Sequence, residues 1–407
     1  MYLEAARDTA GTEAKTVPVR NPSVHAALPV AQSERLLCLD SLRGLALFGV
    51  LCVNLVTEFR VSLFEQFLPQ PAATSVANWL VAGIIRFGLE FKSFILFSLL
   101  FGVGLEIQRQ RCRARGLPFA RYLARRLGFL LALGLVHLFL IWDGDILTLY
   151  ALTGLMASPL LALPARALLP LALGLFVLSV LPLPFGSPFP DSAALVAHVQ
   201  AARHIYAHGT FVEVLAFRVH EVRPISALLL GSAPRTLGLF LLGACAIRRG
   251  LASPGRDRGL LALLVTLGLL AGALVPISAP WALRAWSGVV TEWGSILLAL
   301  GYAAAVRLAF DSARGARLLS VFAPIGQMAF TNYLTQSVVL SVLFYGWGIG
   351  LFGRLSEPQG AGLALLLFAA QGALSTWWLR THRFGPLEWL WRSFTYGALL
   401  PLARDAS

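Results

Sequence analysis

Apolar runs of about 20 residues recur along nearly the whole chain, and this repetition constrains its fold more than any other feature. A helix needs about 20 mainly apolar residues to cross the hydrocarbon core of a bilayer. Charged residues make up 13% of the chain, against about 25% in soluble proteins. The sequence therefore predicts an all-α, polytopic integral membrane protein and excludes an ordinary soluble domain.

Hydropathy and turn residues divide the apolar sequence into about ten transmembrane helices. The predicted spans are Leu36–Val56, Phe87–Gln108, Tyr122–Ile141, Asp145–Leu163, Ala167–Phe185, Ile225–Ile247, Gly259–Ile277, Glu292–Phe310, Val321–Tyr345 and Ala361–Arg380. They form two membrane halves of about five spans each, residues 35–224 and 225–400, with an amphipathic outer-face segment at 187–224. We expect a disordered cytoplasmic tail at 1–34 and a short tail at 401–407.

Positive charge is concentrated in alternate loops between the spans. The segment Gln108–Arg126 holds seven arginines and no acidic residue, and basic residues also follow the sixth, eighth and tenth spans. Basic loops stay on the cytoplasmic side of a membrane, so these loops and both termini are predicted to be cytoplasmic. Because these loops explain the net charge of +13, we expect contact with membrane lipids and no nucleic-acid partner.

The first span carries Asp40, Arg43 and Asn54 inside an apolar run. At about 100° per residue, these three side chains fall within roughly 60° of one another on one helical face. Arg43 and Asn54 are then about 16 Å apart along the helix axis. Polar groups in a membrane usually mark a ligand site or a pathway, so all three are candidate ligand-binding residues. The alternative for Asp40 and Arg43 is a purely structural salt bridge between them.

Three further polar residues in the spans are candidate ligand-binding residues. Lys92 begins the second span and could reach the polar face of the first helix, although snorkelling to the membrane surface is the alternative. Asn332 and Gln336 share one face of the ninth span, where hydrogen bonding between helices is the alternative to substrate contact.

Metal ligands and covalent cofactors have no clear signature in the sequence. His204 and His208 are four residues apart in the outer segment, but no carboxylate or cysteine completes a ligand set, so we expect a solvated helix face and no metal site. The four cysteines show no paired spacing, and we expect no covalently bound cofactor.

Six sequence blocks occur in an order that identifies a family. A first set comprises LDSLRGLALFGVLCVN, FKSFILFSLLFGVGLEIQ and HLFLIWDGDILTLYALTGL, and a second set comprises PIGQMAFTNYLTQSVV, FYGWGIGLFG and GPLEWLWRSFTYG. Together they closely resemble the YeiB-like family of bacterial inner-membrane proteins, whose C-terminal half is classed as a domain of unknown function. The resemblance covers essentially everything after residue 34 and implies an inner-membrane location.

The same resemblance links the chain to the transmembrane acyltransferases. The members that O-acylate bacterial surface sugars have an arginine followed eleven positions later by histidine on the first helix; here Arg43 matches, and Asn54 stands in the place of that histidine. The heparan-glucosaminide N-acetyltransferases are more similar, with the LDxxRG start and an asparagine at this position. Their histidine follows a turn or more later, whereas Leu55–Phe67 contains none. The relationship implies acyl-CoA as a donor, its phosphates bound by Arg43, and a glycan or lipid acceptor.

Asparagine cannot act as a general base near neutral pH, so acyl transfer requires another proton acceptor. His137 is the candidate catalytic residue, because Asp145 in the nearby WDGD turn could orient its ring and raise its basicity. The alternatives are a structural hydrogen bond for His137 and an N-cap of the fourth span for Asp145.

The sequence leaves three function classes open. A membrane-embedded transferase that moves an acyl group to an outer-face or lipid-linked acceptor is the first hypothesis. A transporter or flippase for a small or lipid-like substrate is the alternative, because a polar stripe also suits a translocation path. A structural or signalling protein is the third class, and a homo-oligomer is compatible with all three.

Overall fold

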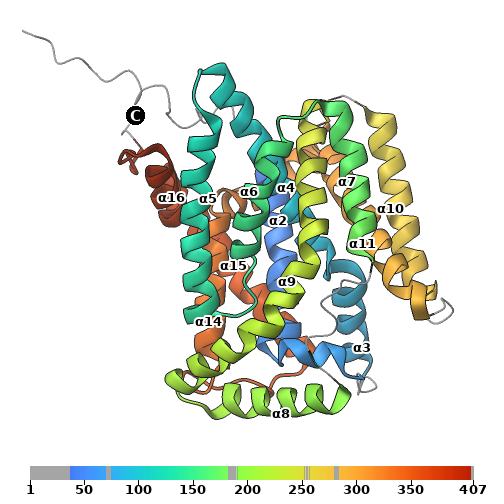
Figure 1. Ribbon diagram of the computed structural model, residues 1–407, viewed down its shortest axis with the longest axis vertical. Helices are drawn as coiled ribbons and strands as arrows, with labels where there is room; N and C mark the ends of the chain where they lie inside the picture. Colours follow the sequence, from blue (N-terminus) through green and yellow to red (C-terminus); the bar gives the residue numbers. More distant parts are fainter. Residues whose placement is uncertain are drawn as a thin grey trace, which may run out of the picture.

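The computed structural model describes residues 37–69, 75–181, 189, 191–251, 253, 255, 257–278 and 284–404. Among these residues the secondary structure is helical, with one isolated β-bridge between His382 and Ala403 and no strand. The predicted all-α class is therefore confirmed (Figure 1). The predicted tail 1–34 and residues 405–407 of the predicted tail 401–407 lie outside the described residues.

The first half of the chain folds into long helices joined by short 3-10 or π-helical segments, which carry the label η. They are α2 (Leu37–Val53), η2 (Asn54–Phe59), η3 (Leu63–Phe67), α3 (Val76–Gly83), η4 (Ile84–Leu89), α4 (Lys92–Ala114), α5 (Phe119–Val136), η5 (His137–Ile141), α6 (Leu147–Leu160), α7 (Ala165–Ser179) and α8 (Ser192–His208). The next helix, α9 (Phe211–Arg248), continues through Pro224. The predicted division between 224 and 225 thus falls inside one helix.

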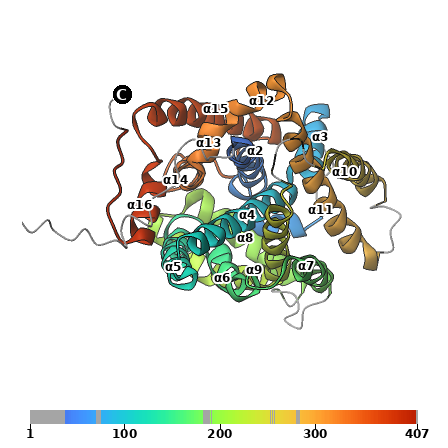
Figure 2. The ribbon, with the colours of Figure 1, turned by 90° about the horizontal axis from the view of Figure 1, so that it is seen from above.

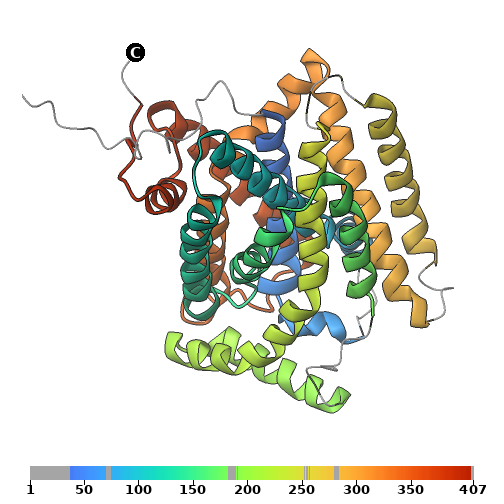
Figure 3. The same cartoon turned by 45° about the horizontal axis from the view of Figure 1, so that its top comes forward.

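The second half contains the remaining helices. They are α10 (Arg258–Ser278), α11 (Arg284–Ala309), α12 (Ala313–Leu319), η6 (Ser320–Phe322), α13 (Ala323–Gln327), α14 (Ala329–Phe344), α15 (Glu357–Thr381) and α16 (Pro386–Tyr396). Figure 3 shows α10 and α11 side by side at one flank of the molecule, where they pack against each other.

Six helical segments are long and apolar enough to cross a membrane, within the part of the chain that the structure describes. They are Leu37–Phe59, Phe119–Ile141, Phe211–Arg248, Arg258–Val275, Gly288–Ala309 and Glu357–Thr381. Three shorter apolar helices are α6, α7 and α14, and α4 corresponds to the predicted second span. These helices are those of a membrane protein, and the count of ten crossings stays a prediction.

Helix α2 stands near the centre of the bundle, with α13 and α15 on one side and α4 on the other (Figure 2). Glycines bring its N-terminal half into backbone contact with η6 and α13. A Cβ atom on Gly326 would lie 1.8 Å from the carbonyl oxygen of Asp40, and one on Gly44 would lie 2.2 Å from that of Phe322. Only glycine fits such an approach, so the LDSLRG and PIGQ blocks are two sides of one helix contact.

The predicted ninth span, Val321–Tyr345, is not one continuous helix. It breaks at Met328, where φ is −108° and ψ is 28°, between α13 and α14. Glu388 in α16 accepts hydrogen bonds from the backbone N–H groups of Phe330 at 2.7 Å and Thr331 at 3.1 Å. This distant carboxylate satisfies the N–H groups that the break exposes at the start of α14.

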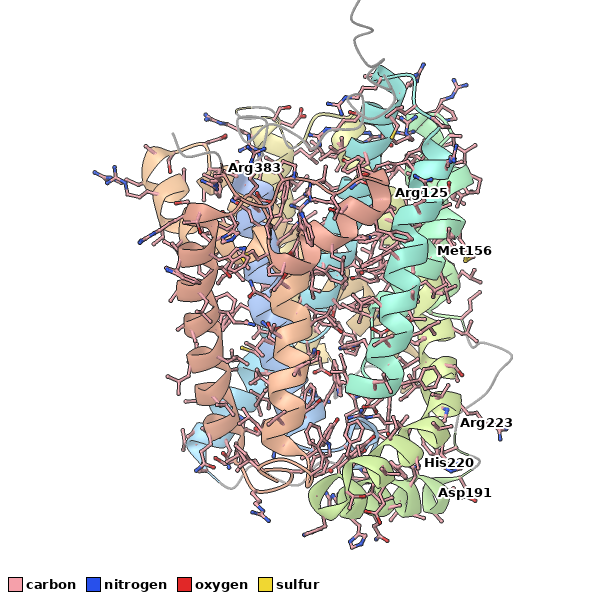
Figure 4. All side chains as sticks on the ribbon, turned by 90° about the vertical axis from the view of Figure 1, so that its left-hand side faces the viewer. Arg125, Met156, Asp191, His220, Arg223 and Arg383 are labelled. Atoms are coloured by element: carbon pink, nitrogen blue, oxygen red, sulfur yellow. The ribbon has the colours of Figure 1, made fainter. Side chains whose placement is uncertain are left out.

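The two ends of the molecule differ in charge in the way that the loop pattern predicts. In Figure 4, Arg125 and Arg383 lie at one end, Asp191 lies at the other together with His220 and Arg223, and Met156 lies between the two ends on the side. Met156 is 57% exposed, as expected of an apolar side chain that faces lipid. The first and last described residues lie at the arginine-rich end (Figure 1); following the topology predicted from the basic loops, we refer to it as the cytoplasmic end and to the opposite one as the outer end.

Candidate functional site

A cavity of about 410 Å³ lies at the outer end of α2. Its walls come from α2, η2, η3, η4, α4, α9 and the loop between η5 and α6. The polar residues that line it are Asn54, Thr57, Glu58, Gln66, Glu90, Ser93, Asp143, Asp145, Ser232 and Arg235, and the remaining walls are aliphatic and phenyl side chains. An apolar pocket with a few convergent polar groups is the usual form of a small-molecule site.

Two π-helical turns, η2 and η4, line this cavity, and a third, η5, ends just before the loop that lines it. Their i to i+5 hydrogen bonds run from Arg60 N to the Leu55 carbonyl oxygen at 2.9 Å, from Glu90 N to that of Ile85 at 2.7 Å, and from Trp142 N to that of His137 at 2.8 Å. A π-helical turn holds one residue more than an α-helical turn and is found most often at functional sites. The backbone around the cavity is thus irregular in all three segments.

Backbone strain also occurs at the cavity wall. Phe91 has φ of 62° and ψ of −38°, in a region that side-chain-bearing residues rarely adopt. It lies between η4 and α4, where the chain turns so that both Glu90 and Phe91 line the cavity. Strained residues of this kind cluster at active sites and ligand clamps.

Asn54 and Glu58 present polar groups to the cavity from one π-helical turn. Among the described residues, the structure gives neither side chain a hydrogen-bond or ion-pair partner. Both are only partly buried, and the cavity is the space that they face. Unpaired polar groups at this depth are costly, so they are candidates for contact with a ligand.

Asp145 combines the two roles that the sequence left open. Its carboxylate accepts hydrogen bonds from the N–H groups of Leu147 at 3.1 Å and Thr148 at 2.8 Å, so it caps α6. It also lies 2.9 Å from Nδ1 of His137 and lines the cavity. Since the carboxylate accepts from Nδ1–H, Nε2 is the basic nitrogen of the neutral ring.

His137 itself lies behind the cavity wall. Its side chain is fully buried, it is not a lining residue, and Nε2 has no hydrogen-bond partner among the described residues. The Tyr333 ring packs over it, with the ring centroids 5.3 Å apart. The ring could reach a cavity ligand only after the wall between them moves.

Arg235 is the basic residue among the cavity-lining residues that the structure describes. Arg235 donates to Glu292 at 2.8 Å from Nη1, and its guanidinium lies 5.7 Å from the Phe91 ring centroid. Its Nε is buried without a partner among the described residues. With four carboxyl groups and this single arginine among its lining residues, the cavity is acidic.

Asp143 lies in the loop between η5 and α6, outside the spanning helices. Burial, together with the charge of the nearby Glu221 carboxyl, raises the pKa of Asp143 to about 7. Asp143 therefore changes its charge in the physiological pH range, unlike an ordinary aspartate.

Asp40 and Arg43 lie at the other end of α2. The Nη1 atom of Arg43 donates to Oδ1 of Asp40 at 2.6 Å, and neither residue lines the cavity. The structure therefore places Asn54 at the cavity and the Asp40–Arg43 ion pair nearer the cytoplasmic end. The predicted polar face of the first helix is divided between two environments.

The remaining candidate residues lie away from the cavity. Lys92 is buried, and its Nζ donates to the carbonyl oxygen of Arg86 at 3.3 Å. Asn332 donates to Ser375 at 3.0 Å, and Gln336 donates to Gln371 at 2.7 Å, which links α14 to α15. None of the three lines the cavity.

Sequence reasoning missed Glu58, Glu90 and Arg235 as site residues, although two of them carry a signal. Glu58 follows Asn54 by four residues on the first helix, which places the two on neighbouring turns of one face. Arg235 is a single arginine inside the predicted sixth span, and an isolated charge there usually marks a function.

Comparison with known proteins shows similarity over most of the chain. Residues 246–398 match the family model described as a protein of unknown function, DUF418. The chain is 33% identical over 399 residues to the uncharacterised protein YxaH of Bacillus subtilis, with 92% of this chain and 98% of that protein covered. It is 32% identical over 402 residues to the uncharacterised protein YeiB of Escherichia coli, with 92% and 100% covered. The chain therefore belongs to the YeiB-like family of membrane proteins.

Proposed function

We propose that this protein is a bacterial inner-membrane acyltransferase that moves an acyl group from cytoplasmic acyl-CoA to a hydroxyl-bearing acceptor in the outer cavity. The observation that carries the proposal is the pairing of Asn54 and Glu58 on one π-helical turn, both facing the cavity without a partner among the described residues. An amide N–H donor beside a carboxylate is what acyl transfer to a hydroxyl needs.

The charges at the two ends of α2 favour different substrates. Phosphate groups suit the arginine-rich cytoplasmic end, where Arg43 lies. The acidic cavity disfavours a phosphate and favours the hydroxyl groups of a glycan or glycolipid, which donate hydrogen bonds to carboxylates. We therefore assign the donor to the cytoplasmic end and the acceptor to the cavity.

In the proposed reaction, Glu58 accepts the proton of the acceptor hydroxyl as its oxygen attacks the thioester carbonyl carbon. The Asn54 amide donates a hydrogen bond to the carbonyl oxygen as negative charge develops there. The C–S bond then breaks, an ester forms, and the thiolate of CoA takes up a proton to leave as the thiol. Asp145, anchored by His137, acts as a positioning residue at the cavity wall.

His137 is the competing proton acceptor. Its Nε2 has no partner among the described residues, and Asp145 holds its ring in the tautomer that leaves Nε2 basic. Glu58 is the first choice because it lines the cavity and His137 does not. The variants Glu58→Gln and His137→Asn decide between them, because the base is the one whose loss abolishes transfer.

The test uses the full-length protein in lipid nanodiscs with acetyl-CoA radiolabelled in its acetyl group. A glycolipid extract of the producing bacterium supplies the acceptor. We expect the label to move into the extract, and we expect Glu58→Gln and Arg43→Ala to abolish this transfer. Glu213→Gln removes a carboxylate that is exposed and outside the cavity, and it should transfer at the wild-type rate.

Two results would overturn the proposal. One is the absence of both acetyl-CoA binding and label transfer in the wild-type protein. The other is substrate flux in proteoliposomes that depends on Asn54 and Glu58 but attaches no acyl group, which would make the protein a transporter.

A further inference from the structure

A second cluster of buried charged groups lies between the cavity and the outer surface. It comprises Asp143 in the loop before α6, Arg218 and Glu221 in α9, and His198 and Tyr206 in α8. The Asp143 and Glu221 carboxyl groups share a hydrogen bond. Helix α8 crosses the outer end of the bundle (Figure 1), so the cluster connects this surface helix with the cavity wall.

The charges of the cluster balance only if it holds a proton. Asp143, Glu221 and Arg218 are 5%, 1% and 1% exposed, so uncompensated charge there is costly. A hydrogen bond between two carboxyl groups requires that one of them is protonated. The other is then a carboxylate whose charge offsets the Arg218 guanidinium. The three groups are together neutral with one proton shared by the carboxyl pair.

The shared proton has a route to the outer surface. One oxygen of Glu221 lies 2.9 Å from Nε2 of His198, and its other oxygen accepts from the Tyr206 hydroxyl. The His198 side chain is 17% exposed. Its ring is held by Phe217, which stacks on it with centroids 5.5 Å apart, and by Phe64, which packs edge-on at 5.0 Å. Imidazole can accept and release a proton near neutral pH.

The other end of the cluster opens on the cavity. Asp143 is a lining residue, and its charge interacts with that of Glu58. The sequence of groups from inside to outside is therefore Glu58 and Asp143 at the cavity, Glu221 in the protein, and His198 at the outer surface. Arg218 lies beside this line, and its Nε and Nη2 atoms have no hydrogen-bond partner among the described residues.

We propose that Asp143, Glu221 and His198 conduct protons between the cavity and the outer face of the protein. A proton leaves when Glu221 passes the shared proton to His198 and Asp143 then takes up a proton from the cavity, which restores the shared proton of the pair; the reverse order brings one in. No oxidant or bound group is required, because each step moves one proton between a donor and an acceptor. This route goes beyond acyl transfer and exists whether or not the cavity binds an acceptor.

Other titratable groups face the route and set its charge. On the cavity side they are Glu58 from η2 and Glu90 before α4, whose charges interact. Around the carboxyl pair they are Arg218, Tyr206 and Tyr345, and the Arg218 guanidinium lies 5.0 Å from the Tyr345 ring centroid. At the surface, Arg203 of α8 pairs with Glu65 of η3.

Infrared spectroscopy of the full-length protein in lipid tests this proposal without any substrate. A protonated carboxyl group has a C=O stretching band that carboxylates lack, and deuterium exchange shifts it. We expect this band at pH 7 in the wild-type protein, rapid exchange in D₂O, and loss of the band in Glu221→Gln. His198→Leu should keep the band but slow its exchange by at least about tenfold, because an apolar group then blocks the outer end.

The matched control is His204→Leu, which changes another histidine of the same helix, one that is exposed and has no contact with the carboxyl pair. It should exchange at the wild-type rate. The proposal is overturned if the wild-type band is identical in Glu221→Gln, or if His198→Leu exchanges as fast as His204→Leu. Since no acyl donor is present, failure here leaves the transferase proposal untouched, and failure of the transferase assay leaves this route untouched.

Discussion

Two groups of polar side chains inside the helix bundle contrast with each other. Between α14 and α15, Gln371 accepts from Gln336 at 2.7 Å and donates to the Asn332 carbonyl oxygen at 3.0 Å, while Asn332 donates to Ser375. These amides are buried and paired. At the cavity, Asn54, Glu58 and Glu90 have no such side-chain partner among the described residues.

The two groups show two different roles that polar side chains have inside a membrane protein. The paired amides of α14 and α15 join two helices, and their hydrogen bonds are complete without a ligand. The groups at the cavity are incomplete, and they occur with π-helical turns and a strained phenylalanine. Both groups are polar side chains inside the helix bundle, and the number of unmade hydrogen bonds distinguishes a helix contact from a site.

The largest expected effect is on transfer activity in Asn54→Ala. Loss of one donor to a developing oxyanion lowers the rate by about 10²–10³-fold. The thermal midpoint should stay near that of the wild type, because Asn54 has no partner among the described residues to lose. Rates from the radiolabel assay and melting curves in the same detergent measure both. A large fall in thermal midpoint would place Asn54 with the helix-joining amides instead.

The reverse result is expected for Gln371→Leu. This substitution removes the partner of Gln336 and the donor to Asn332 and Thr335, at a cost of about 1–3 kcal/mol for the buried groups left unpaired. Its control is Gln66→Leu, an exposed amide at the cavity, with a change within about 0.5 kcal/mol. Chemical unfolding in mixed micelles measures the two free energies. Equal costs would remove the distinction between the groups.

The pH dependence of the free energy of unfolding tests whether Asp143 holds a proton in the folded protein. The pKa of its carboxyl is about 7 in the folded protein and about 4 in an unfolded chain. The folded state therefore holds more protons in this interval, so the free energy of unfolding falls as pH rises from about 4 to about 7. Asp143→Asn should flatten this slope when thermal midpoints are recorded across that range. An unchanged slope would show that Asp143 does not carry the proton.

The smallest expected effect is a gain of stability in Phe91→Gly. Glycine adopts positive φ without strain, so the substitution should stabilise the fold by about 1 kcal/mol. Phe87→Gly, in the adjoining η4 turn, should destabilise it, since negative φ gives glycine no such advantage. Thermal midpoints of the two variants provide the measurement. A loss of stability in both would mean that the Phe91 ring matters more than its backbone.

Much of the fold follows from the sequence, because apolar runs and basic loops act over short distances along the chain. The helix class and most of the helix positions are of this kind. The break at Met328 was not predicted, because the carboxylate that completes it, Glu388, is 60 residues away along the chain. Contacts between residues so far apart in the sequence cannot be predicted from local sequence patterns.

The site was predictable only in part. Asn54, a candidate as a polar residue within a span, and Asp145, a candidate as the partner of His137, both line the cavity, whereas Arg43 and Gln336, candidates for the same reason as Asn54, do not. An intramembrane polar residue shows only that some partner must exist, and the sequence does not say whether that partner is protein or ligand. The three π-helical turns have no local signature, because they depend on the packing around them.

The π-helical turn Asn54–Phe59 holds one residue more than an α-helical turn, and this extra residue affects the direction in which the following side chains point. On the N-terminal side of this turn, close glycine contacts hold α2 against η6 and α13. The rotation of α2 about its own axis is therefore fixed there. Each residue of an α-helix turns the next by about 100°. The direction in which Glu58 points is therefore set by how many residues precede it as much as by their chemistry. Aligning relatives through this segment requires counting from Gly44, and a single-residue deletion would re-aim the carboxylate without changing one neighbouring side chain.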